Sequence, residues 1–168
     1  RALEAGERIT VYGDYDVDGV TSTTLVVRCL RSLGAEVDYY IPARMEEGYG
    51  VNAAALEQIA ARGSRLVITV DTGITAVAEA VRAKEIGLSL VVTDHHQCAE
   101  QLPDCDAVIN PHRPDCSYPF PELAGVGVAL KLCTALTGDP APCFELAALG
   151  TIADVMPLVG ENRILVAQ

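Results

Sequence analysis

Tryptophan is absent from the sequence, and all aromatic residues together make up only 5% of its 168 residues. Basic residues are also scarce, since 12 Lys and Arg stand against 23 Asp and Glu and give a net charge of −11. A chain this acidic argues against broad, non-specific adhesion to nucleic acid. Bound divalent metals would offset several of the acids, and a further domain could supply a basic surface.

Long apolar runs and a signal peptide are also missing, so the sequence predicts no membrane span. No two of the six cysteines have the C-x2-C spacing, which leaves little support for a zinc site. We expect free, mostly buried thiols, as in a reducing cytoplasm, rather than disulfides. The six are Cys29, Cys98, Cys105, Cys116, Cys133 and Cys143.

Half of the residues are hydrophobic, and continuous Val, Ile and Leu runs alternate with helical patterns. We expect strands at 7–13, 36–42, 65–70, 88–93 and 107–110, and helices at 19–33, 52–62, 75–86, 123–136 and 143–152. This alternation predicts an α/β fold: a sheet of about five mainly parallel strands with helices on both faces, followed by a helical C-terminal part. The chain starts without Met and stops in mid-pattern, so we interpret residues 1–168 as one domain from a longer protein.

Three aspartates, Asp14, Asp16 and Asp18, stand at alternate positions directly after the first expected strand. If the backbone stays extended there, alternation directs all three side chains to one face, so that they converge beyond the strand end. Converging carboxylates repel one another, and a hard divalent cation relieves the repulsion. The motif therefore predicts a metal site.

Acidic residues recur after two further expected strands, as Asp71 and as Asp94-His95-His96. In a parallel sheet the C-terminal ends of the strands meet at one edge, where ligands collect. Adjacent side chains diverge, so we expect the two histidines to divide their roles, one binding a metal and the other facing substrate.

An EF-hand calcium loop is a rival interpretation of the first motif, because D-x-D-x-D-G opens such loops. Counting from Asp14, position 12 is Leu25, which has no carboxylate to offer, and the preceding segment is strand-like. The EF-hand interpretation therefore fails. Aspartates in an ordinary surface turn are a simpler alternative, but the recurrence after separate strands counts against it.

Asp154 lies in the otherwise apolar segment 150–158 and needs a cation or a hydrogen-bond donor. A ligand role and a buried helix N-cap role are equally compatible with this segment. Carboxylates and imidazoles without a thiolate favour Mn²⁺ or Mg²⁺ over structural zinc. So many donors suit two ions, and a pair of ions is typical of phosphoester cleavage.

Four segments of the sequence resemble the motifs of the DHH phosphoesterase family, in the form found in its single-strand-specific DNA exonucleases. They are residues 11–19, 70–73, 93–96 and 150–158, and the segments 41–50 and 110–127 are also similar. The resemblance spans nearly the whole chain in order and spacing. It implies the α/β fold expected above and a two-metal centre.

The resemblance implies a role for each acidic residue of the motifs. Asp16 and Asp18 match ligands of different metals, and Asp71 matches a carboxylate that bridges them. His95 and Asp154 match ligands of the second metal.

Other positions match the family less directly. Many relatives have a histidine where this chain has Tyr12, so Asp14 is the candidate substitute ligand. Asp94 and His96 are the expected catalytic residues: Asp94 orients a histidine, and His96 contacts the scissile phosphate or a metal. Arg44 either grips a substrate phosphate or is simply solvated, and Lys131 is expected to be a surface residue.

The implied activity is 5′→3′ hydrolysis of single-stranded DNA to 5′-mononucleotides, in DNA repair and recombination. Two alternatives stay open: a phosphodiesterase acting on short oligoribonucleotides or cyclic dinucleotides, and an inactive scaffold in a replication complex. Candidate partners are single-stranded DNA, a single-strand-binding protein and a helicase. Related proteins also carry a DHH-associated domain and an OB-fold domain, neither of which is visible in this sequence.

Overall fold

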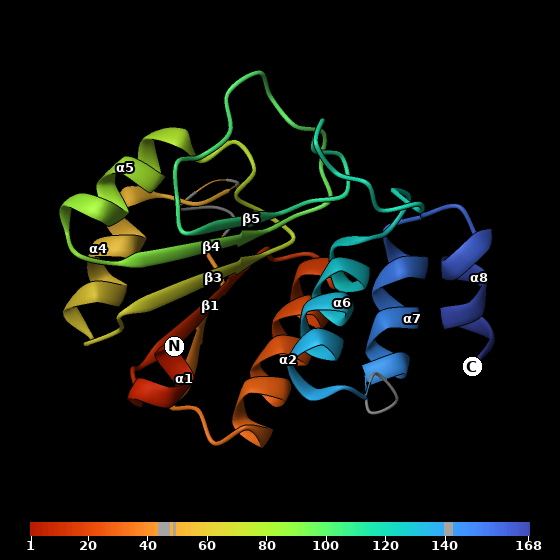
Figure 1. Cartoon of the computed structure of the whole chain (residues 1–168), viewed down its shortest axis with the longest axis horizontal. Helices are drawn as coiled ribbons and strands as arrows, with labels where there is room; N and C mark the ends of the chain where they lie inside the picture. Colours follow the sequence, from red (N-terminus) through yellow and green to blue (C-terminus); the bar gives the residue numbers. More distant parts are fainter. Residues whose placement is uncertain (44–47, 49, 140–142) are drawn as a thin grey trace.

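The computed structural model, which describes residues 1–43, 48, 50–139 and 143–168, is built around a five-stranded parallel sheet (Figure 1). Its strands are β1 (Ile9–Gly13), β2 (Val37–Tyr40), β3 (Leu66–Val70), β4 (Ser89–Thr93) and β5 (Ala107–Ile109). They lie in the order β2-β1-β3-β4-β5, and each neighbouring pair is parallel. The predicted sheet is confirmed, and each strand lies within its expected range.

The register brings the ends of three strands level. Gly13 of β1 is the partner of Val70 of β3, and Val70 is the partner of Thr93 of β4. The next residues along the chain are Asp14, Asp71 and Asp94. All three therefore leave the sheet side by side at its C-terminal edge, as the sequence predicted.

Helices cover both faces of the sheet (Figure 1). One face is covered by α2 (Val17–Ser32) and α6 (Gly125–Thr137), with α7 (Phe144–Ala153) packed beside them and α8 (Gly160–Ala167) outermost. The other face is covered by α4 (Ala53–Ala61) and α5 (Val77–Glu85). Asn52 caps α4 as expected, since its side chain accepts a hydrogen bond from the N–H of Ala55 at 2.7 Å. The short α1 (Ala2–Ala5) and α8 were not predicted.

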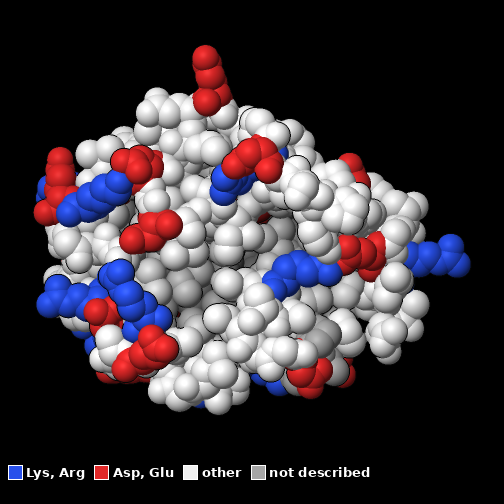
Figure 2. Space-filling model, in the orientation of Figure 1, with Lys and Arg blue, Asp and Glu red and all other residues white. Residues whose placement is uncertain are grey.

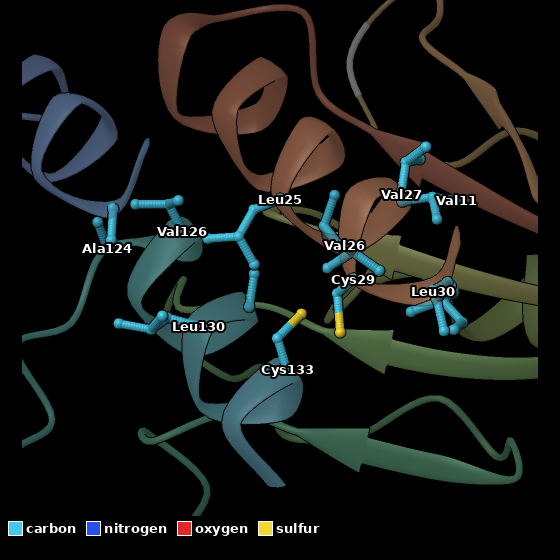
Figure 3. Packing of buried hydrophobic residues seen from close by; sticks show 14 of the residues in the cluster. Val11, Leu25, Val26, Val27, Cys29, Leu30, Ala124, Val126, Leu130 and Cys133 are labelled. Carbon is cyan, nitrogen blue, oxygen red and sulfur yellow. The ribbon is translucent and has the colours of Figure 1, made fainter. Parts of the chain in front are cut away.

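The larger apolar core lies between α2, α6 and the sheet. Figure 3 shows its side chains, among them Val11, Leu25, Val26, Leu30, Val126 and Leu130, with Cys29 and Cys133 close together. All six cysteines are free thiols as predicted, but only Cys29 and Cys133 are fully buried. Burial and the neighbouring Cys29 raise the pKa of the Cys133 thiol, so it stays protonated and packs as an apolar side chain.

Within the described parts of the chain, no helix combines the length and apolar character needed to cross a bilayer.

Candidate metal centre

Four aspartates are buried at the C-terminal edge of the sheet: Asp14, Asp18, Asp71 and Asp94. A buried carboxylate is costly unless a cation or hydrogen-bond donors compensate its charge. For each of the four buried carboxylates, the structure should therefore show which groups compensate its charge.

The first acidic motif does not continue β1 as an extended strand, so our expectation of one common face is wrong. Asp16 is the N-cap of α2, and its side chain accepts a hydrogen bond from the N–H of Gly19 at 2.8 Å. Asp18 lies in the first turn of that helix. Because the helix begins at Val17, the three side chains are directed apart. Asp14 and Asp16 approach Asp71, whereas Asp18 approaches His95.

Asp18 is held by the start of α6. Its two oxygens accept hydrogen bonds from the backbone N–H groups of Gly125, at 2.7 Å, and Val126, at 2.9 Å. Burial raises the pKa of Asp18 to about 6, although these donors and His95 act in the opposite direction. The N-terminus of α6 thus fixes the position of the Asp18 carboxylate, but it does not fully compensate the cost of burying its negative charge.

Asp71 is the least compensated carboxylate in the centre. Its backbone has φ of 59°, a left-handed conformation that is uncommon outside glycine. Its Oδ1 is buried without a hydrogen bond of standard geometry, although His95 Nε2 lies 3.1 Å away. Burial raises the pKa of Asp71 to about 7. An orphaned carboxylate oxygen held in a strained backbone is typical of a metal ligand before the metal is bound.

His95 lies where three carboxylates meet. Its Nε2 is 3.1 Å from Asp71 Oδ1, 3.7 Å from Asp154 Oδ2 and 3.8 Å from Asp18 Oδ2. Burial alone would lower the pKa of His95, but the three acids raise it to about 9. The imidazolium therefore occupies a position that attracts cations, and loss of its proton would turn Nε2 into a ligand atom aimed at the same point.

Both carboxylate oxygens of Asp94 accept hydrogen bonds from neighbouring groups of the protein. Its Oδ1 accepts hydrogen bonds from the N–H groups of His95 and His96, at 2.7 and 3.1 Å, and from His96 Nδ1 at 2.7 Å. Its Oδ2 accepts from the N–H of Ile74 at 2.9 Å. Burial alone would raise the pKa of Asp94, but these hydrogen bonds lower it. Asp94 is thus an ionised support that orients His96, and its hydrogen bond raises the pKa of that imidazole.

Asp154 lies at the C-terminus of a helix, whereas from the sequence we had considered a helix N-terminus. It is the C-cap of α7 rather than an N-cap. A carboxylate is disfavoured at a helix C-terminus by the helix dipole, and burial raises its pKa. The next residue, Val155, has φ of 57°, which is a genuine outlier for a β-branched side chain. The helix C-terminus and the partial burial of the carboxylate both favour a cation as the partner of Asp154.

These side chains form three groups that could each hold a metal ion, with donor atoms within 4.8 Å of one another. They are Asp14-Asp16-Asp71, Asp18-His95-Asp154 and Asp71-His95-His96. Asp71 and His95 each belong to two groups, so the groups are continuous. The arrangement fits two neighbouring hard divalent ions with shared ligands.

Two glycines leave the space that these side chains need. A Cβ atom on Gly125 would lie 2.5 Å from Asp71 Oδ1, and one on Gly150 would lie 2.8 Å from Asp18 Oδ1. Both distances are shorter than any real contact, so side chains are excluded there. We had assigned neither residue a role, although Gly125 belongs to a G-x-G pair at a helix start, a visible signal of close approach.

Comparison with known proteins agrees with this geometry. The model of the DHH family, N-terminal domain, matches residues 8–152. The chain belongs to the DHH family. It is 54% identical over 166 residues to the single-stranded-DNA-specific exonuclease RecJ of Bacillus subtilis (strain 168), a match that covers 98% of this chain and 21% of that protein. The chain thus spans about a fifth of that relative's length.

Solved structures give the same result. A crystal structure of exonuclease RecJ bound to manganese has a TM-score of 0.88 and 45% identity, over 98% of this chain and 43% of the other. A second, of RecJ in complex with Mn²⁺ from Thermus thermophilus, has a TM-score of 0.81 and 40% identity, over 98% of this chain and 24% of the other. Both the expected fold class and the resemblance to the DHH family are confirmed.

Arg44 and Lys131 are the two basic residues for which the sequence suggested a role or a location. Arg44 lies outside the described residues. Lys131 is not a simple surface residue, because its Nζ forms an ion pair with Glu161 and lies 5.5 Å from the centroid of the Tyr118 ring. These contacts tie α6 to α8, so Lys131 has a packing role.

Proposed function

We propose that this domain hydrolyses phosphodiester bonds with two divalent ions, Mn²⁺ or Mg²⁺. In the protein to which it belongs, we propose 5′→3′ exonuclease activity on single-stranded DNA, releasing 5′-mononucleotides in repair and recombination. The observation that carries the proposal is the continuity of the three ligand groups through Asp71 and His95. The similarity to exonuclease RecJ supports the substrate and the choice of metal.

The residues that would hold the ions are Asp14, Asp16, Asp18, Asp71, His95 and Asp154. When bound, such ions activate water and neutralise charge on the phosphate under attack. Asp71 contributes a carboxylate already held between the two sides of the centre, so little reorganisation is needed. His95 must give up its proton before its Nε2 can act as a ligand.

His96 is proposed to contact the scissile phosphate or a metal. Asp94 fixes its ring through the 2.7 Å hydrogen bond to Nδ1, and a ring nitrogen of His96 lies within 4.8 Å of donor atoms of Asp71 and His95. With 46% of its side chain exposed, His96 can reach a substrate while keeping that bond. Its raised pKa favours the protonated form, which suits contact with an anionic phosphate.

We extend the proposal to the setting of the domain. Residues 1–168 would form the DHH domain of a longer protein that also contains a DHH-associated domain and an OB-fold. Its partners would be single-stranded DNA, a single-strand-binding protein and a helicase. The six free thiols favour a reducing cytoplasm as its location.

The test is cleavage of end-labelled single-stranded DNA by the wild-type protein and by Asp71→Ala in Mn²⁺. We expect the variant to lose cleavage, whereas Asp104→Asn, at an exposed acid paired with Lys84, should behave as wild type. The wild type should release mononucleotides from the 5′ end. Near-normal activity of Asp71→Ala would overturn the two-metal model, and a preference for dinucleotides or cyclic dinucleotides would redirect the substrate assignment. Lack of all cleavage by the wild type would favour a scaffold.

A further inference from the structure

A groove of about 360 Å³ lies between α2 and the outer strand β2, away from the ligands described above. Its walls include Val20, Thr24, Arg28 and Arg31 of α2, and Tyr39 and Ile41 at the end of β2. Among the described residues that line it, none is Asp or Glu. In a chain with a net charge of −11, a groove without acids is an unusual local environment.

The groove leads away from the metal centre along one face of α2. Residues 20, 24, 28 and 31 fall on a single stripe of a helix with 3.6 residues per turn. The stripe starts one turn after the N-cap Asp16 and runs for about 16 Å to Arg31, at about 1.5 Å per residue. A strand bound at the metals could therefore continue into the groove.

Unlike five other basic residues of the protein, the two arginines of the groove are held in no ion pair with a described residue. Ion pairs with carboxylates engage Arg8, Arg82, Lys84, Arg113 and Lys131. On the face shown in Figure 2, most basic side chains accordingly lie beside acidic ones. In the described part of the chain, Arg28 and Arg31 have no carboxylate within ion-pair distance, and Arg31 makes only a long hydrogen bond, 3.4 Å, to the carbonyl of Val37. Their charges are therefore available to an anion.

Alternation along β2 explains why the groove lacks acids. Successive side chains of a strand point to opposite faces, so Tyr39 faces α2 while Asp38 points away. Arg8 then holds the acids of that other face, at 3.8 Å from Asp38 and 3.5 Å from Glu36. The Tyr39 ring is left 55% exposed beside the arginines.

Unpaired arginines beside an exposed aromatic ring are the combination that binds single-stranded nucleic acid without reading its sequence. We propose that the groove between α2 and β2 is a secondary binding track for a single strand, in which Arg28 and Arg31 contact phosphates and Tyr39 stacks on a base. The proposal rests on the proposed function, since it extends the path of a strand held at the metal centre.

The test compares the full protein with Arg28→Ala/Arg31→Ala in steady-state cleavage of a 30-nucleotide oligodeoxythymidylate with Mn²⁺ over a range of salt. We expect KM to rise roughly tenfold with kcat within about twofold, because the arginines lie outside the ligand set. Loss of two phosphate contacts should also make the slope of log(kcat/KM) against log[salt] shallower by about 1.4. Tyr39→Ala should raise KM about fivefold, and Tyr39→Phe should keep the wild-type value.

The matched control is Arg62→Ala/Arg65→Ala, which removes two exposed positive charges just before β3, at residues that do not line the groove. It should leave KM and the salt slope unchanged. Equal effects of the two double variants would show a general charge effect and overturn the track. Unchanged KM in Arg28→Ala/Arg31→Ala, with normal wild-type cleavage, would overturn the track alone. If the wild type cleaves dinucleotides but not the long strand, the proposed function fails and the track fails with it.

Discussion

The two sides of the metal centre are built differently. On one side, Asp18 is buried and receives two backbone hydrogen bonds from α6, and it faces His95 and Asp154. On the other side, Asp14 and Asp16 approach Asp71, and Asp16 is exposed and also caps α2. The first side is supported by backbone donors of a distant helix, whereas the second joins Asp71 to a local turn whose Asp16 is open to solvent. A preformed side should hold its metal tightly, and an open side should admit substrate.

The largest effect should come from removing the negative charge of Asp18, the side chain that α6 supports. In Asp18→Asn an amide NH₂ would face at least one of the N–H donors of Gly125 and Val126, so a buried donor loses its acceptor. We expect the free energy of unfolding in Mn²⁺ to fall by about 1–3 kcal/mol and one ion to be lost. Denaturant titration and metal analysis of the purified protein measure both.

Asp16→Asn is the matched change on the open side. Asparagine is as good an N-cap as aspartate, so stability should change by only a few tenths of a kcal/mol while cleavage falls. If both variants are equally destabilised, the difference between the two sides that we describe is wrong.

The next effect should come from filling the space around Asp71. In Gly125→Ala the new Cβ would lie 2.5 Å from Asp71 Oδ1, and we expect a loss of about 1–3 kcal/mol with weaker Mn²⁺ binding. Gly127→Ala in the same helix meets its neighbour less closely, at 3.1 Å from Leu123 Cδ2 and 3.2 Å from Leu123 Cβ. That control should stay within about 1 kcal/mol of wild type, because alanine also improves helix propensity. Equal metal affinity in the two variants would argue against the proposed space requirement.

Acidification should weaken metal binding on the side that contains His95 before it weakens binding on the side of Asp14 and Asp16. The neighbouring acids raise the pKa of His95 to about 9, so below pH 9 a metal must displace its proton. The affinity for Mn²⁺ on the side of Asp18, His95 and Asp154 should therefore fall about tenfold per pH unit down to pH 7. Below pH 7, protonation of Asp71, whose pKa is about 7, weakens both sides. Calorimetric titration with Mn²⁺ in two buffers of different ionisation enthalpy counts the released protons. No proton release at pH 8 would contradict a ligand role for His95.

The smallest effect should come from the strained residue beside Asp154. Val155→Gly removes the cost of a β-branched side chain at φ 57°, partly offset by the greater freedom of the unfolded chain. We expect a gain of up to about 1 kcal/mol and unchanged metal content. Val81→Gly, at a half-exposed position within α5, should instead destabilise by about 0.5–1 kcal/mol. Thermal unfolding of both variants decides, and destabilisation by Val155→Gly would mean that the side chain has a role of its own.

Local patterns were enough to predict the sheet and its ligand-bearing edge. Strands β3 and β4 are largely apolar runs, and the residue after each has to leave at the C-terminal edge, so Asp71 and Asp94 could be placed without coordinates. The cysteines were also correctly predicted to be free. These features depend only on neighbours in the chain and on the period of two in a strand.

Contacts between distant segments could not be predicted in the same way. The backbone donors to Asp18 come from residues 107 and 108 positions away, and Asp154 arrives from the C-terminus of a helix that we had considered starting there. The extended path assumed for Asp16 and Asp18 was wrong because helix α2 begins at once and turns them apart. The groove beside Arg28 likewise exists only because β2 packs against α2. Residue order sets which groups are available and at which edge they emerge, but only the packing of α2, α6 and α7 brings them to ligand distance, since that depends on how helix faces fit together in three dimensions.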